Sequence, residues 1–215
     1  AMSGRPEDST PAAARAVVLV YPDCALADAL GPRLAVRQPT FFAMGALDDW
    51  TPVAQCRAVL ERSEIAFTAL PETGEGDCAR PDRTRLGDYP LAPDTPAVTC
   101  PVAAALELWR RESVAPAARN ILGSDLARIE HLGAFSCRRM YGGADGPWSE
   151  HATANAIDIA AFVLEDGRRI SVLGDWEGEA DKARFLKRVR DGACTSFATV
   201  LSPDYNAAHA DHLHF

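Results

Sequence analysis

Four of the five histidines in this 215-residue chain lie in two short polar segments that are far apart in the sequence. The first segment, Ser149–Asp158, holds His151, and the second, His209–His214, holds the other three. Each segment also contains a carboxylate, and imidazole and carboxylate groups are typical ligands of zinc. The pattern therefore predicts a metal site, and the fold must bring the two segments together.

The spacing within each segment limits how a metal ion can be bound. His151 and Asp158 are seven residues apart, which on a continuous helix is about 10.5 Å of rise and too far for both to bind one ion. A loop that ends at His151 and a strand that carries Asp158 would allow the chain to reverse and bring them together. His212 and His214 would share one face of a strand, either as two ligands or as one ligand and one catalytic partner.

The composition is that of an ordinary globular protein, with 47% hydrophobic and 24% charged residues. A net charge of −8 argues against a uniformly basic surface, so we expect no nucleic-acid partner. No apolar run reaches the roughly 18 residues of a membrane span. Ala1-Met2-Ser3-Gly4 is typical of residues left by an expression vector. We therefore expect that a signal peptide or a membrane anchor of the natural protein has been removed.

The six cysteines are widely spaced and form no Cys-x-x-Cys motif, which argues against a zinc finger and a thioredoxin-type site. An even, dispersed set favours disulfides in an oxidising compartment, and the alternative is six buried thiols. Cys137 and Cys194 flank the first metal-binding segment and are the preferred pair.

The N-terminal half gives few structural signals. Residues 1–14 are expected to be a disordered lead-in or vector residues, and residues 15–97 a subdomain. Within it the pattern predicts a strand over 16–21, a helix over 51–62 with Thr51 as its cap and Pro52 in its first turn, and a strand over 65–70. Residues 71–97 are rich in Pro, Gly and Asp and predict a long loop, pinned by Cys78 and Cys100, that marks a domain boundary.

The signals are clearer in residues 98–215, the predicted catalytic domain. A helix is expected from Thr99, interrupted at Pro116 and ending near Gly123, and a second over 179–191, stopped by Gly192. Strands are predicted over 126–131, 133–137, 155–164, 169–173 and 198–201, and from 213 onward. Short strands with intervening helices predict an α+β fold, with a small antiparallel sheet that carries the zinc site and is flanked by helices.

The two histidine segments resemble a known group of enzymes. Ser-x-His-x-x-Ala-x-Ala-x-Asp followed by His-x-Asp-His-x-His is similar to the zinc peptidases related to D-Ala-D-Ala carboxypeptidases, lysostaphin-type enzymes and murein endopeptidases. More closely, the chain from about Cys100 onward resembles the bacterial extensin-like C-terminal domain. The matching stretches are Cys100-Pro101, Ile129–Gly133, Cys137-Arg138, Ser149–Ala152, Asn155–Asp158, Asp191–Cys194 and Pro203–Asn206, with a weaker extension back through Cys56 and Cys78.

The resemblance implies a role for each residue of the two segments. The zinc ligands would be His151, Asp158 and His214, with a water as the fourth. Asp211 would accept a proton from this water and later pass it to the leaving amine.

The resemblance also implies roles for the neighbouring residues. His209 and His212 would orient the water or stabilise the charged intermediate. Arg138 would bind a substrate carbonyl or carboxylate, and Ser149 would support the first ligand or contact the substrate.

Other polar residues near the motifs have simpler interpretations. His131 is expected to be a packed histidine, Arg139 a solvated charge, and Glu150 a supporting residue beside a ligand. Asp204 and Tyr205 either line the cleft or form an ordinary turn. Ala154 stands where the related enzymes have glycine, and its methyl group is expected to narrow the substrate path if the backbone there has a positive φ.

Together these features predict a zinc-dependent peptidoglycan hydrolase that cleaves peptide bonds in murein stem peptides or cross-links. We expect a D,D-endopeptidase or carboxypeptidase in the periplasm or envelope of a bacterium. One alternative is a zinc-containing cell-wall binding module without catalysis, and another is a hydrolase of a different peptide or amide.

Overall fold

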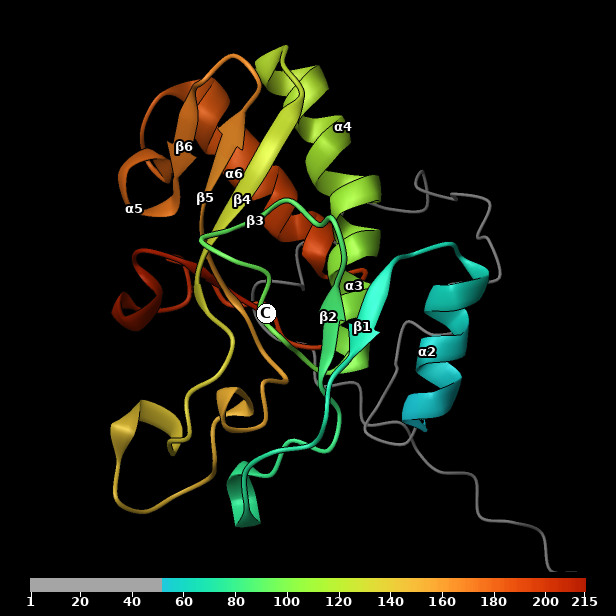
Figure 1. Cartoon of the computed structure of the whole chain (residues 1–215). Helices are drawn as coiled ribbons and strands as arrows, with labels where there is room; N and C mark the ends of the chain where they lie inside the picture. Colours follow the sequence, from blue (N-terminus) through green and yellow to red (C-terminus); the bar gives the residue numbers. More distant parts are fainter. Residues whose placement is uncertain (1–51) are drawn as a thin grey trace, which may run out of the picture.

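The computed structural model describes residues 52–215 (Figure 1). The predicted lead-in over 1–14, the predicted strand over 16–21 and the predicted Thr51 cap lie outside the described residues. None of the helices between residues 52 and 215 has the length and apolarity needed to cross a bilayer.

The larger of the two sheets has five strands. They are β3 (Leu91–Ala92), β4 (Leu126–Gly133), β5 (Asp158–Leu164), β6 (Arg169–Ser171) and β7 (Leu213–His214). β5 is central, because it pairs antiparallel with β4, β6 and β7, whereas the short β3 pairs parallel with β4. With helices packed on this small, mainly antiparallel sheet, the fold is α+β as predicted.

Two helical segments pack against each other and against the sheet (Figure 1). The first comprises α3 (Cys100–Trp109), η4 (Arg110–Val114), α4 (Ala115–Ala117) and η5 (Ala118–Leu122), and the second is α6 (Ala180–Ala193). Trp109 is fully buried between them and the sheet. Its Nε1 donates to the Val189 carbonyl at 2.8 Å, and its ring lies 5.9 Å from that of Phe162. This aromatic core fixes the sheet that carries Asp158 and His214.

The predicted interruption at Pro116 is wrong, because the helical chain continues from Cys100 to Leu122. Pro116 lies in α4, between the wide π-type turns η4 and η5. Such turns relax the regular hydrogen-bond ladder next to a residue that has no N–H to donate. The segment ends at Gly123, whose φ of 69° matches the expected glycine stop.

Gly192 does not stop α6, which begins close to the predicted start but continues to Ala193. A Cβ atom at Gly192 would lie 2.2 Å from the Ser113 hydroxyl oxygen. The glycine therefore serves the close approach of α6 to η4 rather than the end of the helix.

The N-terminal part confirms the predicted helix and overturns part of the predicted loop. α2 (Val53–Arg62) begins directly after Pro52, and β1 (Phe67–Ala69) is shorter than the predicted strand. The predicted loop contains three further elements, η3 (Gly76–Cys78), β2 (Thr84–Leu86) and β3. β2 pairs with β1, and β3 pairs with β4 of the large sheet. Residues 71–97 are thus held by backbone pairing that their Pro- and Gly-rich composition conceals.

Four predicted strands differ from the observed ones. The predicted strand over 133–137 is absent, because β4 extends to Gly133, the chain then leaves the sheet, and Ser136 N–H donates to the His151 carbonyl. β5 starts at Asp158 rather than at residue 155, and residues 198–201 supply only a bridge between Leu201 and His214. β6 ends at Ser171, because the Ser171 hydroxyl accepts from Gly174 N–H and caps the short helix α5 (Val172–Asp175).

The predicted Cys137–Cys194 disulfide is wrong. Cys137 bonds to Cys78, and Cys56 bonds to Cys100. Cys194 is also disulfide-bonded, but not to Cys137. Sequence position alone suggested the wrong pair, because it did not show that the segment with Cys78 folds back against the chain after β4. The disulfides are consistent with an extracellular or envelope location.

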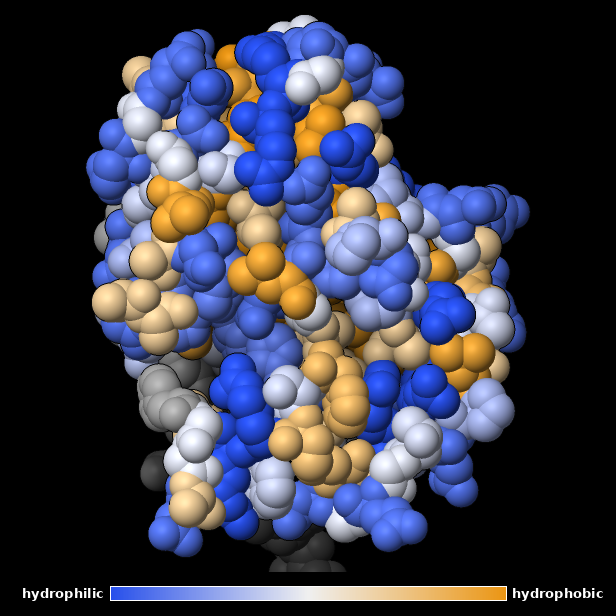
Figure 2. All heavy atoms as spheres, turned by 60° about the vertical axis from the view of Figure 1, so that its left-hand side comes forward, coloured by the Kyte–Doolittle hydropathy of each residue, from blue (hydrophilic) through white to orange (hydrophobic). Residues whose placement is uncertain are grey.

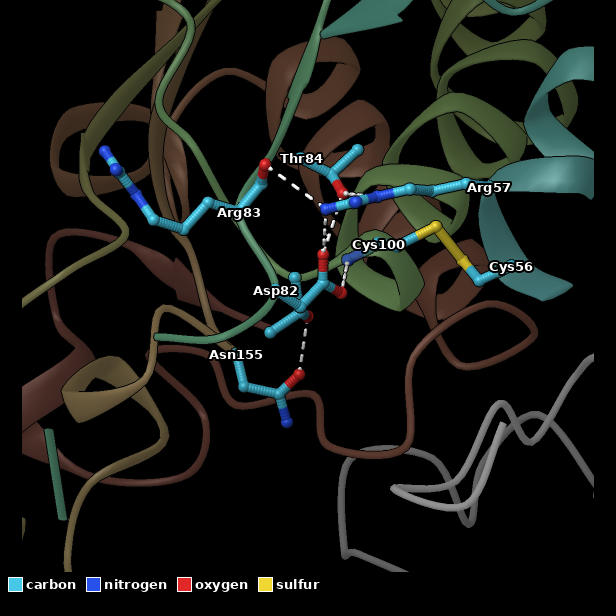
Figure 3. Close-up of a disulfide and its surroundings, with 8 residues drawn as sticks. Cys56, Arg57, Asp82, Arg83, Thr84, Cys100 and Asn155 are labelled. Carbon is cyan, nitrogen blue, oxygen red and sulfur yellow. Dashed lines mark hydrogen bonds and ion pairs between the residues drawn. A yellow bond between two sulfur atoms is a disulfide. The ribbon is translucent and has the colours of Figure 1, made fainter. Parts of the chain in front are cut away.

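A buried carboxylate joins the N-terminal elements beside the Cys56–Cys100 disulfide (Figure 3). Asp82 accepts from the Cys100 N–H at the start of α3, from Arg57 at 3.0 Å and from the Thr84 hydroxyl at 2.9 Å. The negative charge lies at the positive end of the helix dipole and is paired with a guanidinium. Asp82 therefore links α2 and β2 to the beginning of α3.

Removing the Cys78–Cys137 disulfide with a double serine variant is expected to destabilise the protein by about 2–5 kcal/mol. The two cysteines are 59 residues apart, and losing so long a cross-link restores much entropy to the unfolded chain. Thermal unfolding should show a decrease of about 5–15 °C. The double serine variant of Cys56 and Cys100 is the matched control and should lose a comparable amount. An unchanged unfolding temperature would contradict the expectation.

Candidate metal centre

The first histidine segment, Ser149–Asp158, begins with a short turn that places His151 against the residues that follow β4. Ser149 caps η7 (Glu150–Ala152), and its hydroxyl accepts from the His151 N–H at 3.3 Å. The His151 ring is almost completely buried, and its Nδ1 lies 3.2 Å from the Ala134 carbonyl oxygen. Ser149 therefore fixes the His151 backbone and the Ala134 carbonyl orients its ring before any ligand is considered.

The remaining two residues come from neighbouring strands. Asp158 is the first residue of β5 and lies directly opposite His214 of β7 in the antiparallel register. The chain reversal expected between His151 and Asp158 occurs in the turn after η7. The structure thus brings together His151, Asp158 and His214, the three ligands that the resemblance implied.

The donor atoms of these three residues all lie within 4.8 Å of one another. Asp158 Oδ1 is 2.8 Å from His214 Nδ1 and 3.2 Å from His151 Nε2, and the two imidazole nitrogens are 3.2 Å apart. A tetrahedral zinc ion with bonds of about 2.0–2.1 Å separates its ligand atoms by about 3.3 Å. The two distances of 3.2 Å match this spacing, and the distance of 2.8 Å is about half an ångström shorter.

The hydrogen-bonding pattern of the His151 ring also favours binding of a cation among the three side chains. The Ala134 carbonyl can only accept, so His151 Nδ1 carries a proton. When the ring is neutral, as it must be to bind a metal ion, Nε2 presents a lone pair toward the Asp158 carboxylate and His214 Nδ1, whereas a second proton on the ring would let Nε2 donate to Asp158. Lone pairs that face one another at about 3 Å repel unless a proton or a metal ion lies among them. Two imidazoles and one carboxylate form a donor set that zinc prefers, so the residues present fit this ion.

Burial alone would raise the pKa of the Asp158 carboxyl group. Hydrogen bonds from His151 and His214, together with the charges of His151 and His212, outweigh burial and hold the pKa well below its usual range. Asp158 is therefore ionised throughout the neutral range and available as an anionic ligand.

The other two histidines of the second segment lie beside the three ligands. His212 Nε2 is 3.5 Å from Asp158 Oδ1, and the His209 ring lies 5.9 Å from that of His214. His212 Nδ1 donates to Asp211 at 2.7 Å. The Asp211 carboxylate thus lies on the far side of the His212 ring from the ligands, an arrangement that the spacing did not reveal. His212 also lies outside β7. The expectation that His212 and His214 share one face of a strand is therefore wrong.

The two arginines after Cys137 differ in their surroundings. The Arg139 guanidinium stacks over the Trp148 ring at 4.5 Å and donates to the Gly146 carbonyl. Among residues 52–215 the Arg138 side chain makes no hydrogen bond or ion pair, and it is exposed. Its backbone carbonyl accepts from Ser149 N–H, so Arg138 is adjacent to the turn that holds His151.

Ala154 adopts a left-handed backbone with a φ of 59°. This is the conformation that makes glycine favourable at a position and costs other residues about 1–2 kcal/mol. The Ala154 side chain is completely buried, so its methyl group packs inside the turn. The next residue, Asn155, accepts from the Thr99 hydroxyl and donates to Glu150, which ties the turn to the start of α3.

Two further residues of the site were not singled out in the sequence. The Ala134 carbonyl is a backbone group, and no residue type signals it. Asn206 Oδ1 contacts His209 Nδ1 at 2.8 Å and accepts from Ala208 N–H. An Asn three residues before a histidine was the only available signal. His131 is buried and lies 3.0 Å from the Asp94 carbonyl, outside the ligand cluster.

The surface in Figure 2 is largely hydrophilic, with separate hydrophobic patches and a hollow in its middle. The large hydrophobic side chains that are exposed among the described residues are Leu132, Phe135, Met140, Leu173 and Tyr205. Leu132 and Phe135 flank the backbone that holds His151, and the Tyr205 ring lies 5.8 Å from that of His209. Exposed apolar side chains thus lie on the chain segments next to Ala134 and next to His209.

The family model described as "Extensin-like protein C-terminus" matches residues 54–215, about three quarters of the chain. No match was found among the curated proteins or the solved structures. The family match includes α2 and the N-terminal sheet as well as the two histidine segments, and so extends further toward the N-terminus than the firm part of the resemblance. The chain therefore belongs to the extensin-like protein C-terminus family.

Proposed function

We propose that this protein is a zinc-dependent hydrolase that cleaves peptide bonds in peptidoglycan stem peptides or cross-links. The observation that carries the proposal is the convergence of His151 Nε2, His214 Nδ1 and an Asp158 carboxylate oxygen within 4.8 Å. His151, Asp158 and His214 would hold the ion, and when bound it would supply Lewis-acid activation of water and of the scissile carbonyl.

The residues around the ligands would handle the proton. Asp211 and His212 form a hydrogen-bonded pair that has one end toward the ligands and one toward solvent, because the Asp211 side chain is half exposed. This pair would accept a proton from the attacking water and return it to the leaving amine. His209 lies next to His212, with ring centroids 5.1 Å apart, and would stabilise developing negative charge.

Binding of the peptide would rely on the groups around the ligands. The Arg138 guanidinium has no partner among the described residues, so it is free to bind a substrate carbonyl or carboxylate. Leu132, Phe135 and Tyr205 would contact the apolar parts of the peptide. The disulfides are consistent with the periplasm or envelope, where peptidoglycan is found.

The proposal predicts about one zinc ion per chain and chelator-sensitive cleavage of muropeptides. Purified protein would be analysed for metal and incubated with monomeric and cross-linked muropeptides, and the product masses would identify the bond. Zinc without new products would support a cell-wall binding module instead. Absence of zinc after the metal has been supplied would refute the proposed site.

A further inference from the structure

The segment that carries the second set of histidines is a closed loop. Leu201 and His214 pair through two backbone hydrogen bonds of 2.9 Å, so the residues between them form a loop whose two ends are joined. We call residues 202–213 the histidine loop. It carries His209, Asp211 and His212, whereas the ligand His214 lies at its closing point.

The histidine loop is anchored near its beginning by Asp204. Its carboxylate accepts from Trp176 Nε1 and from Arg190 Nη1, each at 2.8 Å. Trp176 and Arg190 are both buried. Arg190 lies on α6, whose own packing against the aromatic core is described above. Asp204 thus ties the loop to a rigid helix.

The Asp204 carboxylate is ionised at neutral pH. Partial burial would raise its pKa, but the hydrogen bonds from Trp176 and Arg190 and the nearby positive charges lower it below the usual range. A charged hydrogen bond to a buried guanidinium is stronger than a neutral one. The anchor is therefore stronger than an ordinary loop contact.

A chain of local contacts leads from the anchor to the imidazoles. Tyr205 N–H donates to the Ser202 carbonyl at 2.9 Å, which forms the turn around Asp204. Asn206 then caps η8 (Ala207–His209) and holds His209 Nδ1. The position of His209 thus depends on where Asp204 is held, whereas His212 adjoins Leu213, which pairs with Ile159 of β5.

His214 is held differently. Its backbone pairs with Leu201 on one side, and it lies opposite Asp158 in the sheet on the other. Release of the histidine loop would therefore leave the three ligands in place and displace His209. Metal binding and catalysis would then depend on different parts of the same segment.

We propose that Asp204, bound by Trp176 and Arg190, is a positioning residue that holds His209 beside the metal ligands. Its effect on catalysis rests on the proposed function, whereas its effect on the loop does not. The two consequences can be measured separately.

The test compares Asp204→Asn with Asp191→Asn. Asp191 accepts from the same guanidinium at 2.6 Å. The control variant therefore also removes one carboxylate charge next to Arg190, but it does not alter the histidine loop. In Asp204→Asn, hydrogen exchange of the amides in residues 205–210 should be at least about tenfold faster than in the wild type, which corresponds to about 1.4 kcal/mol. In Asp191→Asn it should be unchanged.

Zinc content and kinetics complete the experiment. Asp204→Asn should keep about one zinc per chain and lose at least about tenfold in kcat with little change in KM. Asp204→Glu should restore part of the kcat, because it retains the charge. Equal exchange rates in the two asparagine variants, or loss of zinc in Asp204→Asn, would overturn the proposal.

Two complications are covered by the design. If Asp204→Asn is not folded, as judged by its thermal transition, the hydrogen-exchange rates of Asp204→Glu test the proposal instead. The longer glutamate side chain would displace the carboxylate from Trp176 and Arg190, and exchange in residues 205–210 should be faster than in the wild type. If the wild type cleaves no muropeptide, the proposed function fails, and the exchange rates alone still decide whether Asp204 holds the loop.

Discussion

Replacing His151 with alanine is expected to abolish stoichiometric zinc binding, and hydrolysis with it. His151 provides one of three donors, and its ring is already oriented by the Ala134 carbonyl. Loss of residues that only support a ligand costs about 10- to 100-fold in metal affinity, so loss of a ligand should cost more. Metal analysis after dialysis against a zinc buffer would measure the effect.

His131→Ala is the matched control for this variant. His131 is also buried, but it contacts Asp94 and lies outside the ligand cluster. The control should keep about one zinc per chain even if its stability decreases. Equal zinc content in the two variants would show that His151 is not a ligand.

Replacing Asp211 with asparagine is expected to lower kcat by about 10²- to 10⁴-fold, the range found when a general acid–base group is removed. Asp211 contacts His212 rather than a ligand, so zinc binding should be retained. Asparagine has nearly the same size but cannot accept and return a proton. Metal analysis and muropeptide digestion on the same preparation would separate the two effects.

Glu150→Gln is the comparison for Asp211, because Glu150 is the carboxylate next to the ligand His151 in the sequence. The Glu150 side chain accepts from Asn155 and supports the turn. If Glu150→Gln is inactive and Asp211→Asn remains active, the roles of the two carboxylates have been assigned wrongly.

The clustering of His151, Asp158 and His214 was predictable only in part. Residue types and spacing indicated a metal site in the two segments, but the choice of these three residues came from the family resemblance. The structure places the three side chains together. The fold class was also predictable, since the buried strand at residues 158–164 and the helices around Trp109 and Leu186 have clear hydrophobic patterns.

The parts that were missed depend on contacts between distant segments. The Cys78–Cys137 pair, the β3–β4 pairing and the reason for Gly192 are all set by what lies opposite each residue in space. Likewise, the Ala134 carbonyl and the Asp204 anchor function through partners far away in the sequence. Local patterns contain no information on such pairs.

The pairing of β7 with β5 has a consequence for the order of folding. His214 is 63 residues from His151 and 56 from Asp158, and contacts over such separations form late because a large loop must close first. A partly folded chain can contain the shorter-range pairing of β4 with β5 while His214, and Phe215 beside it, are still undocked. Under the proposed function, the protein would therefore stay inactive during synthesis and early folding, and would gain activity only in its last step of assembly.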